Sequence, residues 1–310
     1  MTGALVVVEA RSSMGREPGV VLQHLGPATA LEVLLARLAP IRSLARAPIV
    51  VATSDRNDDD PIVEIAERLR LRVVRSPDAD PLEALVQALV RHAPEAVVHI
   101  EACGPGGGPL GDPFVVAAAV ARWADTGADI VTNQLPRSYP QGVDVSVFGA
   151  RALRAAALEA TDPLDRARPA RLLVRHPERF RLANLDSGHD ASAERWRLED
   201  RADLHALTTM LAQVPDPIRT GWDRLLAIVG RRVRPQPGEP VLHAAPGPTP
   251  GSHPWLRQWT VAVDGRTIGS VSVEATHGRS SRHVTVPDEH REATLAALYR
   301  VLVDDDQVGP

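Results

Sequence analysis

The sequence predicts an α/β protein whose first part is a doubly wound, mainly parallel sheet with helices on both faces. Short continuous apolar runs, rich in valine, alternate with stretches whose apolar residues recur at helical spacing. The runs have the length of strands that are buried on both faces, and turn-forming residues close them. Such alternation is typical of parallel strands that are joined by helical crossovers.

The elements follow one another regularly up to residue 132. The apolar runs predict strands at residues 4–8, 48–52, 72–75, 96–100 and 129–132. The periodic stretches between them predict helices at residues 29–38, 60–70, 81–92 and 113–126. The second of these helices has Asp60 as a cap and Pro61 in its first turn, which is a common way for a helix to begin.

The pattern changes after residue 132. A loop and an alternating strand are predicted over residues 135–147, helices over 150–159 and 165–175, strand-like and acidic segments over 184–200, and a helix over 202–214. The prolines of Pro215-Asp216-Pro217 then stop the helix. These elements extend the first domain to about residue 215.

A smaller unit is predicted at the C-terminal end. Residues 234–252 are rich in proline and glycine and are typical of a linker. Strands at 259–263 and 267–273 flank Asp264-Gly265, a strong hairpin signal, and a third strand at 283–286 precedes a helix at 288–303. We therefore expect a sheet domain at 1–215, a helix and linker at 216–253, and a small α+β domain at 254–310. The small domain is expected to serve homodimerisation or docking to a partner protein.

The composition excludes several classes of function. The net charge of −4 and the 3% share of aromatic residues leave neither a basic stripe nor a stacking platform for nucleic acid. The single cysteine, Cys103, and the missing membrane-length apolar run favour a cytoplasmic protein with no membrane partner. The chain contains no lysine, so any phosphate site must use arginine or backbone N–H groups.

The loops that follow the strands carry a resemblance to a known family. Residues 9–22 read E-A-R-S-S-M-G-R-E-P-G-V-V-L and resemble the opening motif Q-A-R-M-G-S-T-R-L-P-G-K-V-L of the spore-coat-polysaccharide type of cytidylyltransferases. Residues 135–145, L-P-R-S-Y-P-Q-G-V-D-V, are similar to that family's L-P-R-T-Y-P-D-G-L-D-V. Further matches run in order to Arg195-Trp196, so the resemblance covers about two thirds of the chain.

The resemblance implies a nucleotide-diphospho-sugar transferase type of fold that transfers a nucleotidyl group from CTP, or another nucleotide, to a sugar or sugar-acid acceptor. It implies catalytic roles for Arg11 and Arg16 at the phosphates. The residues implied to bind the nucleotide are Ala10, Arg11, Gly15, Arg16, Thr53, Ser54 and Cys103. Those implied to bind the acceptor are Arg137, Tyr139, Gly142 and Asp144, although prolines and glycine at 136–142 are equally consistent with a purely structural turn.

Two departures from the family motifs concern charge and metal. Val20 stands at the family's lysine, and Cys103 stands where the family has an aspartate that holds Mg²⁺. Thiol is a poor Mg²⁺ ligand, so a retained Mg²⁺ site would have to use carboxylates. The candidate ligands are Glu101, Asp112 and Glu199, with Asp200 as a further substitute.

These departures leave alternative functions open. The chain is either a working cytidylyltransferase-like enzyme of polysaccharide or natural-product biosynthesis, or a degenerate pseudoenzyme that binds a nucleotide or sugar for a partner. A glycosyltransferase-like protein is a third alternative, because a nucleotide-sugar site uses the same edge of the sheet. The enzyme hypothesis requires that Glu101, Asp112 or Asp200 converge with Glu199 on one metal position.

Overall fold

The computed structural model describes residues 3–78, 80–188, 190–230, 241–244, 256–263, 266–276, 279–290 and 294. The chain divides into two compact units, Met1–Trp222 and Asp223–Pro310. None of the helices among the described residues has the length and apolar character needed to cross a membrane.

The first unit is built on a seven-stranded sheet in the order β5-β4-β1-β6-β8-β7-β9. β1, β4, β5 and β6 run parallel, β8 is antiparallel to its neighbours β6 and β7, and β9 is parallel to β7. The strands are β1 (Ala4–Glu9), β4 (Ile49–Ser54), β5 (Arg72–Ser76), β6 (Ala96–Glu101), β7 (Ile130–Thr132), β8 (Ser146–Gly149) and β9 (Leu182–Asn184). The predicted mainly parallel α/β fold is confirmed.

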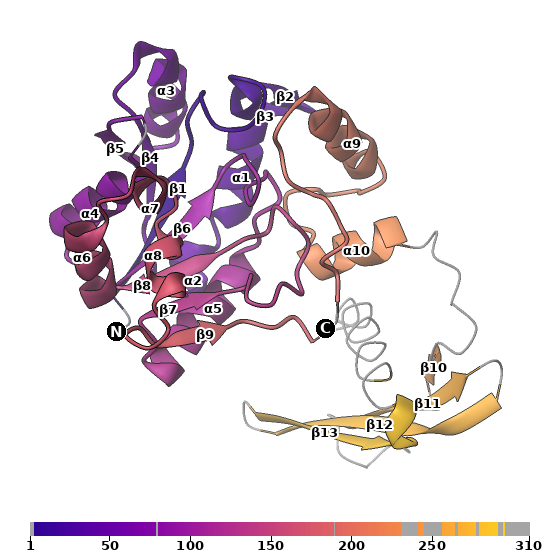
Figure 1. Ribbon diagram of the computed structural model, residues 1–310. Coiled ribbons are helices and arrows are strands. Elements are labelled where there is room, and N and C mark those ends of the chain that lie inside the picture. Colours follow the sequence, from indigo (N-terminus) through magenta and orange to yellow (C-terminus); the bar gives the residue numbers. More distant parts are fainter. Residues whose placement is uncertain are drawn as a thin grey trace. The chain divides into compact units, whose positions relative to one another are not determined.

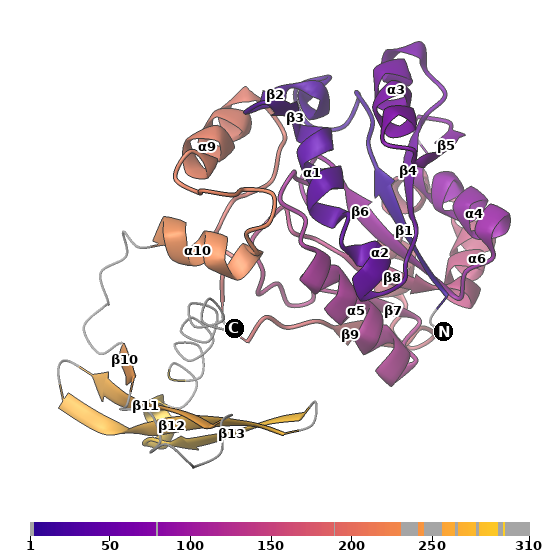
Figure 2. The ribbon, with the colours of Figure 1, turned by 180° about the vertical axis from the view of Figure 1, so that it is seen from behind.

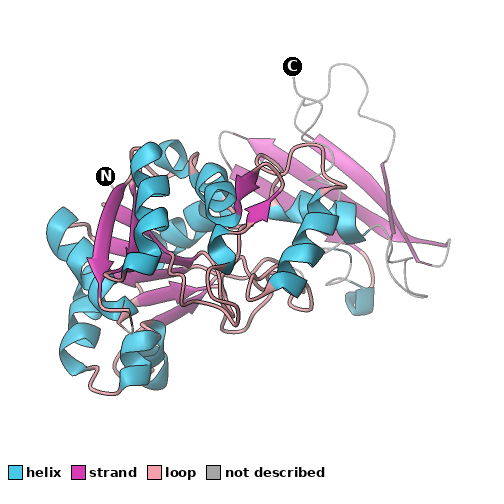
Figure 3. Cartoon of the chain, turned by 90° about the horizontal axis from the view of Figure 1, so that it is seen from above, coloured by secondary structure: helices cyan, strands magenta, loops and turns pink. Residues whose placement is uncertain are grey.

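Helices cover both faces of this sheet (Figure 3). Figure 1 shows α4 and α6 packed together along one face, and the view from behind in Figure 2 shows α1, α2 and α5 in front of the sheet. The helices are α1 (Ala30–Leu38), α2 (Ile41–Leu44), α3 (Asp60–Arg68), α4 (Pro81–His92), α5 (Pro113–Thr126), α6 (Ala150–Glu159), α7 (Pro163–Ala167), α8 (Ala170–Arg175) and α9 (Arg201–Leu211). Short 3-10 turns, η1 (Val20–Leu22) and η2 (Asn57–Asp59), and the small β2–β3 pair (His24–Leu25 and Ala28–Thr29) complete the connections.

The helix starts have local causes in the sequence. The Thr29 side chain and Glu32 form a capping box at the start of α1, and the aspartates before Pro81 and Pro113 cap α4 and α5. These caps satisfy backbone N–H groups that would otherwise lack partners. They explain why the predicted starts of α4 and α5 agree with the structure.

One predicted helix is broken in two. Residues 165–175 were expected to be helical throughout, but α7 ends at Ala167 and α8 begins at Ala170. Pro169 lies between them and cannot donate the backbone hydrogen bond that a continuous helix requires. The break leaves Arg168 in the connection between the two helices.

The face of the sheet that α4, α6 and α8 cover contains the main apolar core. Because side chains alternate along a strand, Leu5 and Val7 of β1 share this face with Glu9, and Val97 of β6 shares it with His99 and Glu101. The core therefore becomes polar at the carboxyl ends of these strands.

The second unit contains a four-stranded antiparallel sheet in the order β10-β11-β12-β13. Its strands are β10 (Val241–Ala244), β11 (Leu256–Val263), β12 (Arg266–Thr276) and β13 (Arg279–Thr285), and helix α10 (Trp222–Gly230) precedes them. β10 lies within the stretch that was predicted to be linker, so the prediction of three strands missed one. The turn Asp264-Gly265 and most of the predicted helix 288–303 lie outside the described residues.

Candidate active site

A cavity of about 800 Å³ opens at the carboxyl ends of β1, β6 and β7. The loop that follows β1, the segment before β8 and the connection between α7 and α8 form its other walls. Polar side chains that line it include Glu9, His99, Glu101, Thr132, Asp144 and Ser146. The carboxyl edge of a doubly wound sheet is where such folds bind ligands, so this cavity is the candidate active site.

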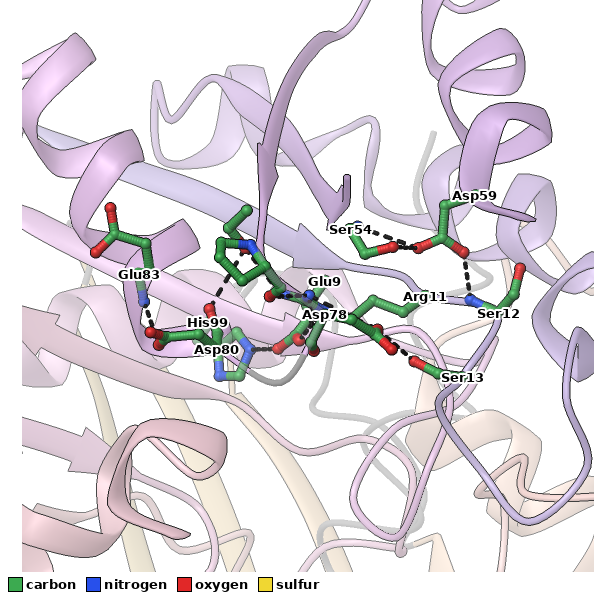
Figure 4. Close-up of polar contacts among 12 residues, drawn as sticks. Glu9, Arg11, Ser12, Ser13, Ser54, Asp59, Asp78, Asp80, Glu83 and His99 are labelled. Atoms are coloured by element: carbon green, nitrogen blue, oxygen red, sulfur yellow. Dashed lines mark hydrogen bonds and ion pairs between the residues drawn. The ribbon is translucent and has the colours of Figure 1, made fainter. Parts of the chain in front are cut away.

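Three titratable side chains meet on the floor of the cavity. Glu9 lies opposite Glu101 in the register of β1 and β6, and His99 lies two residues before Glu101 on the same face. One ligand atom from each residue lies within 4.8 Å of the others. His99 Nε2 is 2.7 Å from Glu9 Oε2, and Arg11 Nε donates to Glu9 Oε1 at 2.9 Å (Figure 4).

Burial and neighbouring charges set the pKa values of this group. Burial disfavours ionised Glu9, but the contacts with His99 and Arg11 outweigh it and lower the pKa of Glu9. Burial also disfavours the charged form of His99, yet the two carboxylates around it raise the pKa of His99. Burial, with smaller repulsion from Glu9 and Asp144, raises the pKa of Glu101 to about 7. The Glu101 carboxylate makes no hydrogen bond or ion pair with any other described residue.

Arg11 lies in the cavity wall but is held by the protein. Its side chain is 1% exposed, and it donates to Glu9, to the carbonyl oxygens of Pro77 and Asp78, and to Ser76 Oγ. These bonds attach the end of β1 to the segment between β5 and α4. The predicted phosphate contact of Arg11 would have to compete with them.

The loop after β1 is anchored at two places. Asp59 accepts a hydrogen bond from the Ser12 N–H group at 2.6 Å and also contacts Ser54 (Figure 4). Burial disfavours the ionised Asp59, but these bonds prevail and lower the pKa of Asp59. At the second anchor, the N–H groups of Arg16 and Glu17 both donate to the Glu199 carbonyl oxygen.

Gly15 and Arg16 contribute to this second anchor. Gly15 has φ +84°, and a Cβ atom there would lie 2.8 Å from the Glu199 carbonyl oxygen, so only glycine fits. The Arg16 side chain is 59% exposed and pairs with Glu199 at 3.3 Å and with Asp200 at 2.6 Å. Of these two residues, only Gly15 lines the described part of the cavity.

The segment before β8 contributes one ion pair and a structural turn. Arg137 and Asp144 form a two-pronged pair that lines the cavity, and burial raises the pKa of Asp144 despite Arg137. Tyr139 is buried, with its ring 4.8 Å from that of Trp222. Gly142 has φ +100° and packs against the backbone of residues 196 and 197. The predicted acceptor residues therefore separate into a pair that faces the cavity and two that shape the turn.

The glycine run 106–108 is required by close packing. A Cβ atom at Gly107 would lie 2.4 Å from the Cys103 carbonyl oxygen, and one at Gly106 would lie 2.6 Å from the Asp144 carboxylate. Cys103 itself is fully buried, and burial raises the pKa of its thiol above the ordinary range. Among the other predicted nucleotide-binding residues, Ala10, Thr53 and Ser54 are buried too, and the cavity lining within the described residues includes none of them.

Glu101, Asp112 and Glu199, the carboxylates predicted to hold Mg²⁺, do not form one group, whereas Glu199 and the further substitute Asp200 both pair with Arg16. Asp112 caps α5, accepts from the Trp222 N–H group and lies 3.8 Å from the buried Arg37. Glu199 pairs with Arg16 through one carboxylate oxygen and with Arg197 through the other. Within the described residues, only Glu101 of the three predicted ligands belongs to the group of side chains that could share a cation. The Mg²⁺ arrangement that the resemblance implies does not fit this site.

Sequence reasoning missed several cavity residues. Glu9 and His99 were not singled out, although each follows the inward-facing apolar residues of its strand by two positions and could have been found from that alternation. Arg168 was also missed, because it was placed inside a continuous helix. It is exposed, lines the cavity and makes no ion pair with another described residue. The other cavity arginines, Arg11, Arg137 and Arg171, all pair with carboxylates.

The fold and the cavity together define an α/β protein with a candidate ligand site at the carboxyl edge of its sheet. The structure is similar to that of a cytidylyltransferase from Leptospira borgpetersenii, with a TM-score of 0.69, 20% identity, and coverage of 74% of this chain and 95% of that one. It is also similar to CMP:2-keto-3-deoxy-manno-octonic acid synthetase complexed with CTP, with a TM-score of 0.50, 12% identity, and coverage of 68% and 98%. These two likenesses concern the fold.

The sequence itself identifies a relative. The chain is homologous to the spore coat polysaccharide biosynthesis protein SpsF of Bacillus subtilis, with 25% identity over 224 residues, which are 70% of this chain and 90% of the relative. The resemblance to the spore-coat-polysaccharide type of cytidylyltransferases is thereby confirmed. No protein-family model matches the chain.

Proposed function

We propose that the first unit transfers a cytidylyl group from CTP to a sugar or sugar-acid acceptor. The observation that carries the proposal is the cavity of about 800 Å³ at the carboxyl edge of the sheet, bordered by the loop that matches the family's opening motif. A structural neighbour with the same fold is complexed with CTP, and the homologous protein is named for polysaccharide biosynthesis. In the proposed reaction an acceptor oxygen attacks the α-phosphorus of CTP in line and pyrophosphate leaves.

The charges around the cavity favour an acceptor that carries a carboxylate or a phosphate. Arg11, Arg137 and Arg171 are each committed to carboxylates of the protein, whereas Arg168 is not. An arginine can bind either anion through two parallel hydrogen bonds. Arg168 would thus hold the acceptor, and the break in the helix at Pro169 would determine where its guanidinium group can reach.

A second candidate function is binding without catalysis. Val20 replaces the family's lysine and is fully buried, while Arg11 and Arg16 are both engaged in ion pairs. The cavity therefore offers fewer cations to a triphosphate than the motif of the family would. A nucleotide- or sugar-binding pseudoenzyme that acts with a partner is consistent with that loss.

The experiment that separates the two is a calorimetric titration with CTP, followed by an assay of pyrophosphate release with sugar acids and sugar phosphates. Release above the background of CTP alone supports transfer. Binding of CTP or sugar without release supports the second candidate, and binding of neither contradicts both.

The role of Arg168 is tested by Arg168→Gln beside Arg154→Gln, which removes an exposed arginine of α6 outside the cavity. For an active enzyme, Arg168→Gln should raise the KM for the acceptor about tenfold to hundredfold, the cost of losing charged hydrogen bonds. Arg154→Gln should leave it unchanged. Equal KM values for all three proteins would contradict acceptor binding by Arg168.

A further inference from the structure

Glu9, His99 and Glu101 are brought together by the sheet itself. Glu9 is the last residue of β1, and Glu101 is the last residue of β6, directly opposite in register. His99 lies two residues before Glu101 on the same face of β6, and all three side chains lie on the floor of the cavity. Residues on neighbouring central strands keep their spacing more strictly than residues on loops, which suits a site that must hold a ligand at fixed distances.

We propose that these three side chains form a binding site for a divalent first-row transition-metal cation. One ligand atom from each lies within 4.8 Å of the other two. Around a cation with bonds of about 2.1 Å, adjacent ligand atoms lie about 3 Å apart and opposite ones about 4.2 Å apart. The 2.7 Å between His99 Nε2 and Glu9 Oε2 is close to the first value, and the ligand atom of Glu101 lies within 4.8 Å of both.

The Glu101 carboxylate is the second observation that points to a cation. It faces the cavity beside the carboxylates of Glu9 and Asp144 and has no hydrogen bond or ion pair with a described residue. Glu9 and Asp144 each have an arginine partner, but Glu101 has none within the described part of the chain. A partly buried carboxylate beside two others is stabilised by a compensating charge, and a bound cation supplies it.

The ligand types indicate which cation fits. An imidazole with two carboxylates suits Mn²⁺, Zn²⁺ or Co²⁺, whereas Mg²⁺ and Ca²⁺ prefer all-oxygen sites. Arg11 donates to Glu9 Oε1 and so directs Oε2 of the same carboxylate toward His99. The site is separate from Cys103 and Glu199, the positions that match the metal ligands of the family, and it shares only Glu101 with the ligands predicted from the sequence. It does not depend on the proposed transfer reaction, since a binding protein could hold the same cation.

A purely structural explanation makes a different prediction. Arg11, Glu9 and His99 form a continuous chain of hydrogen bonds that could stabilise the edge of the sheet without any metal. Glu101 lies outside that chain of bonds. Replacement of Glu101 therefore removes a metal ligand while it leaves the structural network intact, which makes Glu101→Gln the informative variant.

The test is a titration of the metal-free full-length protein with Mn²⁺, in which electron paramagnetic resonance measures the free cation. We expect one Mn²⁺ per chain, displaced by Zn²⁺ and retained in an excess of Mg²⁺. Glu101→Gln should weaken binding at least about tenfold, the lower end of the effect of removing even an outer-shell partner. Glu64→Gln, the same change at an exposed position on α3, should bind as the wild type does, and so should Glu199→Gln.

Circular dichroism melting shows whether each variant is folded. Absence of saturable Mn²⁺ binding to the wild type would overturn the proposal, as would equal affinity in Glu101→Gln. Loss of binding in Glu199→Gln but not in Glu101→Gln would overturn it too, because the cation would then occupy the position that the resemblance implies. His99→Gln gives an independent check and should weaken binding to a similar extent.

Discussion

Replacement of Arg11 by methionine should destabilise the first unit severely. Although the opening motif predicts a phosphate ligand at this position, the side chain is 1% exposed and donates four hydrogen bonds within the protein. Methionine fills part of the volume but leaves two carbonyl oxygens, one hydroxyl group and the Glu9 carboxylate without this donor. Breaking a buried ion pair on one side costs about 3–5 kcal/mol.

Arg16→Met is the matched control. Arg16 belongs to the same motif and also pairs with carboxylates, but its side chain is 59% exposed. Exposed pairs contribute about 0–1 kcal/mol because water screens them. The two substitutions are chemically identical, so the difference between them isolates burial and the hydrogen bonds of Arg11.

Urea unfolding of the full-length variants, followed by circular dichroism, measures both effects. With a slope of about 2–3 kcal/mol per molar urea, Arg11→Met should lower the midpoint by about 1–2 M. Arg16→Met should shift it by less than about 0.5 M. Similar small shifts in both variants would refute the reasoning, since they would show that Arg11 is free to leave its protein partners and bind a phosphate.

Three further predictions concern the surroundings of the cavity. Folding lowers the pKa of Asp59, so the ionised carboxylate contributes its full stabilisation above the unfolded pKa of about 3.9 and loses it as the pH falls through the folded pKa. In urea titrations, the difference in unfolding free energy between wild type and Asp59→Asn should therefore shrink below about pH 4. Gly107→Ala should lower the free energy of unfolding by about 1–3 kcal/mol, because the new methyl group would meet backbone oxygens at 2.4 and 2.6 Å. Gly149→Ala is the control, since its nearest atom is 3.4 Å away, and an equal loss there would exclude steric overlap as the cause. Burial and a raised pKa should make Cys103 react slowly with a thiol reagent in the folded protein and rapidly in denaturant; rapid reaction in the native state would place the thiol at the surface.

The elements that local signals specify were predictable. α4 and α5 begin at prolines behind capping aspartates, and short, mainly apolar runs predicted the central strands. The break between α7 and α8 was missed because the apolar periodicity continues across Pro169. β10 was missed because it is a short run inside a stretch rich in proline and glycine.

The residues of the candidate active site also separate into those that the sequence could locate and those that it could not. The motifs located the loop after β1 and the pair Arg137 and Asp144 at the cavity, since both lie in continuous segments of the chain. They could not show that Arg11 is held by bonds to residues 76–78, or that Arg37 pairs with Asp112 and Arg16 with Glu199. Ion-pair partners are chosen by packing across elements, and periodicity carries no information about them.

The sequence by itself determined the α/β class, the parallel strands with their helical crossovers, and the similarity to cytidylyltransferases, because alternation, caps and contiguous motifs are local properties. Only the tertiary structure decided which charges face the cavity. The register of β1 against β6 sets Glu9 beside Glu101 and His99, which lie about ninety positions later in the chain. That juxtaposition depends on which strands become neighbours, and long-range pairing of this kind is fixed by the packing of the whole sheet.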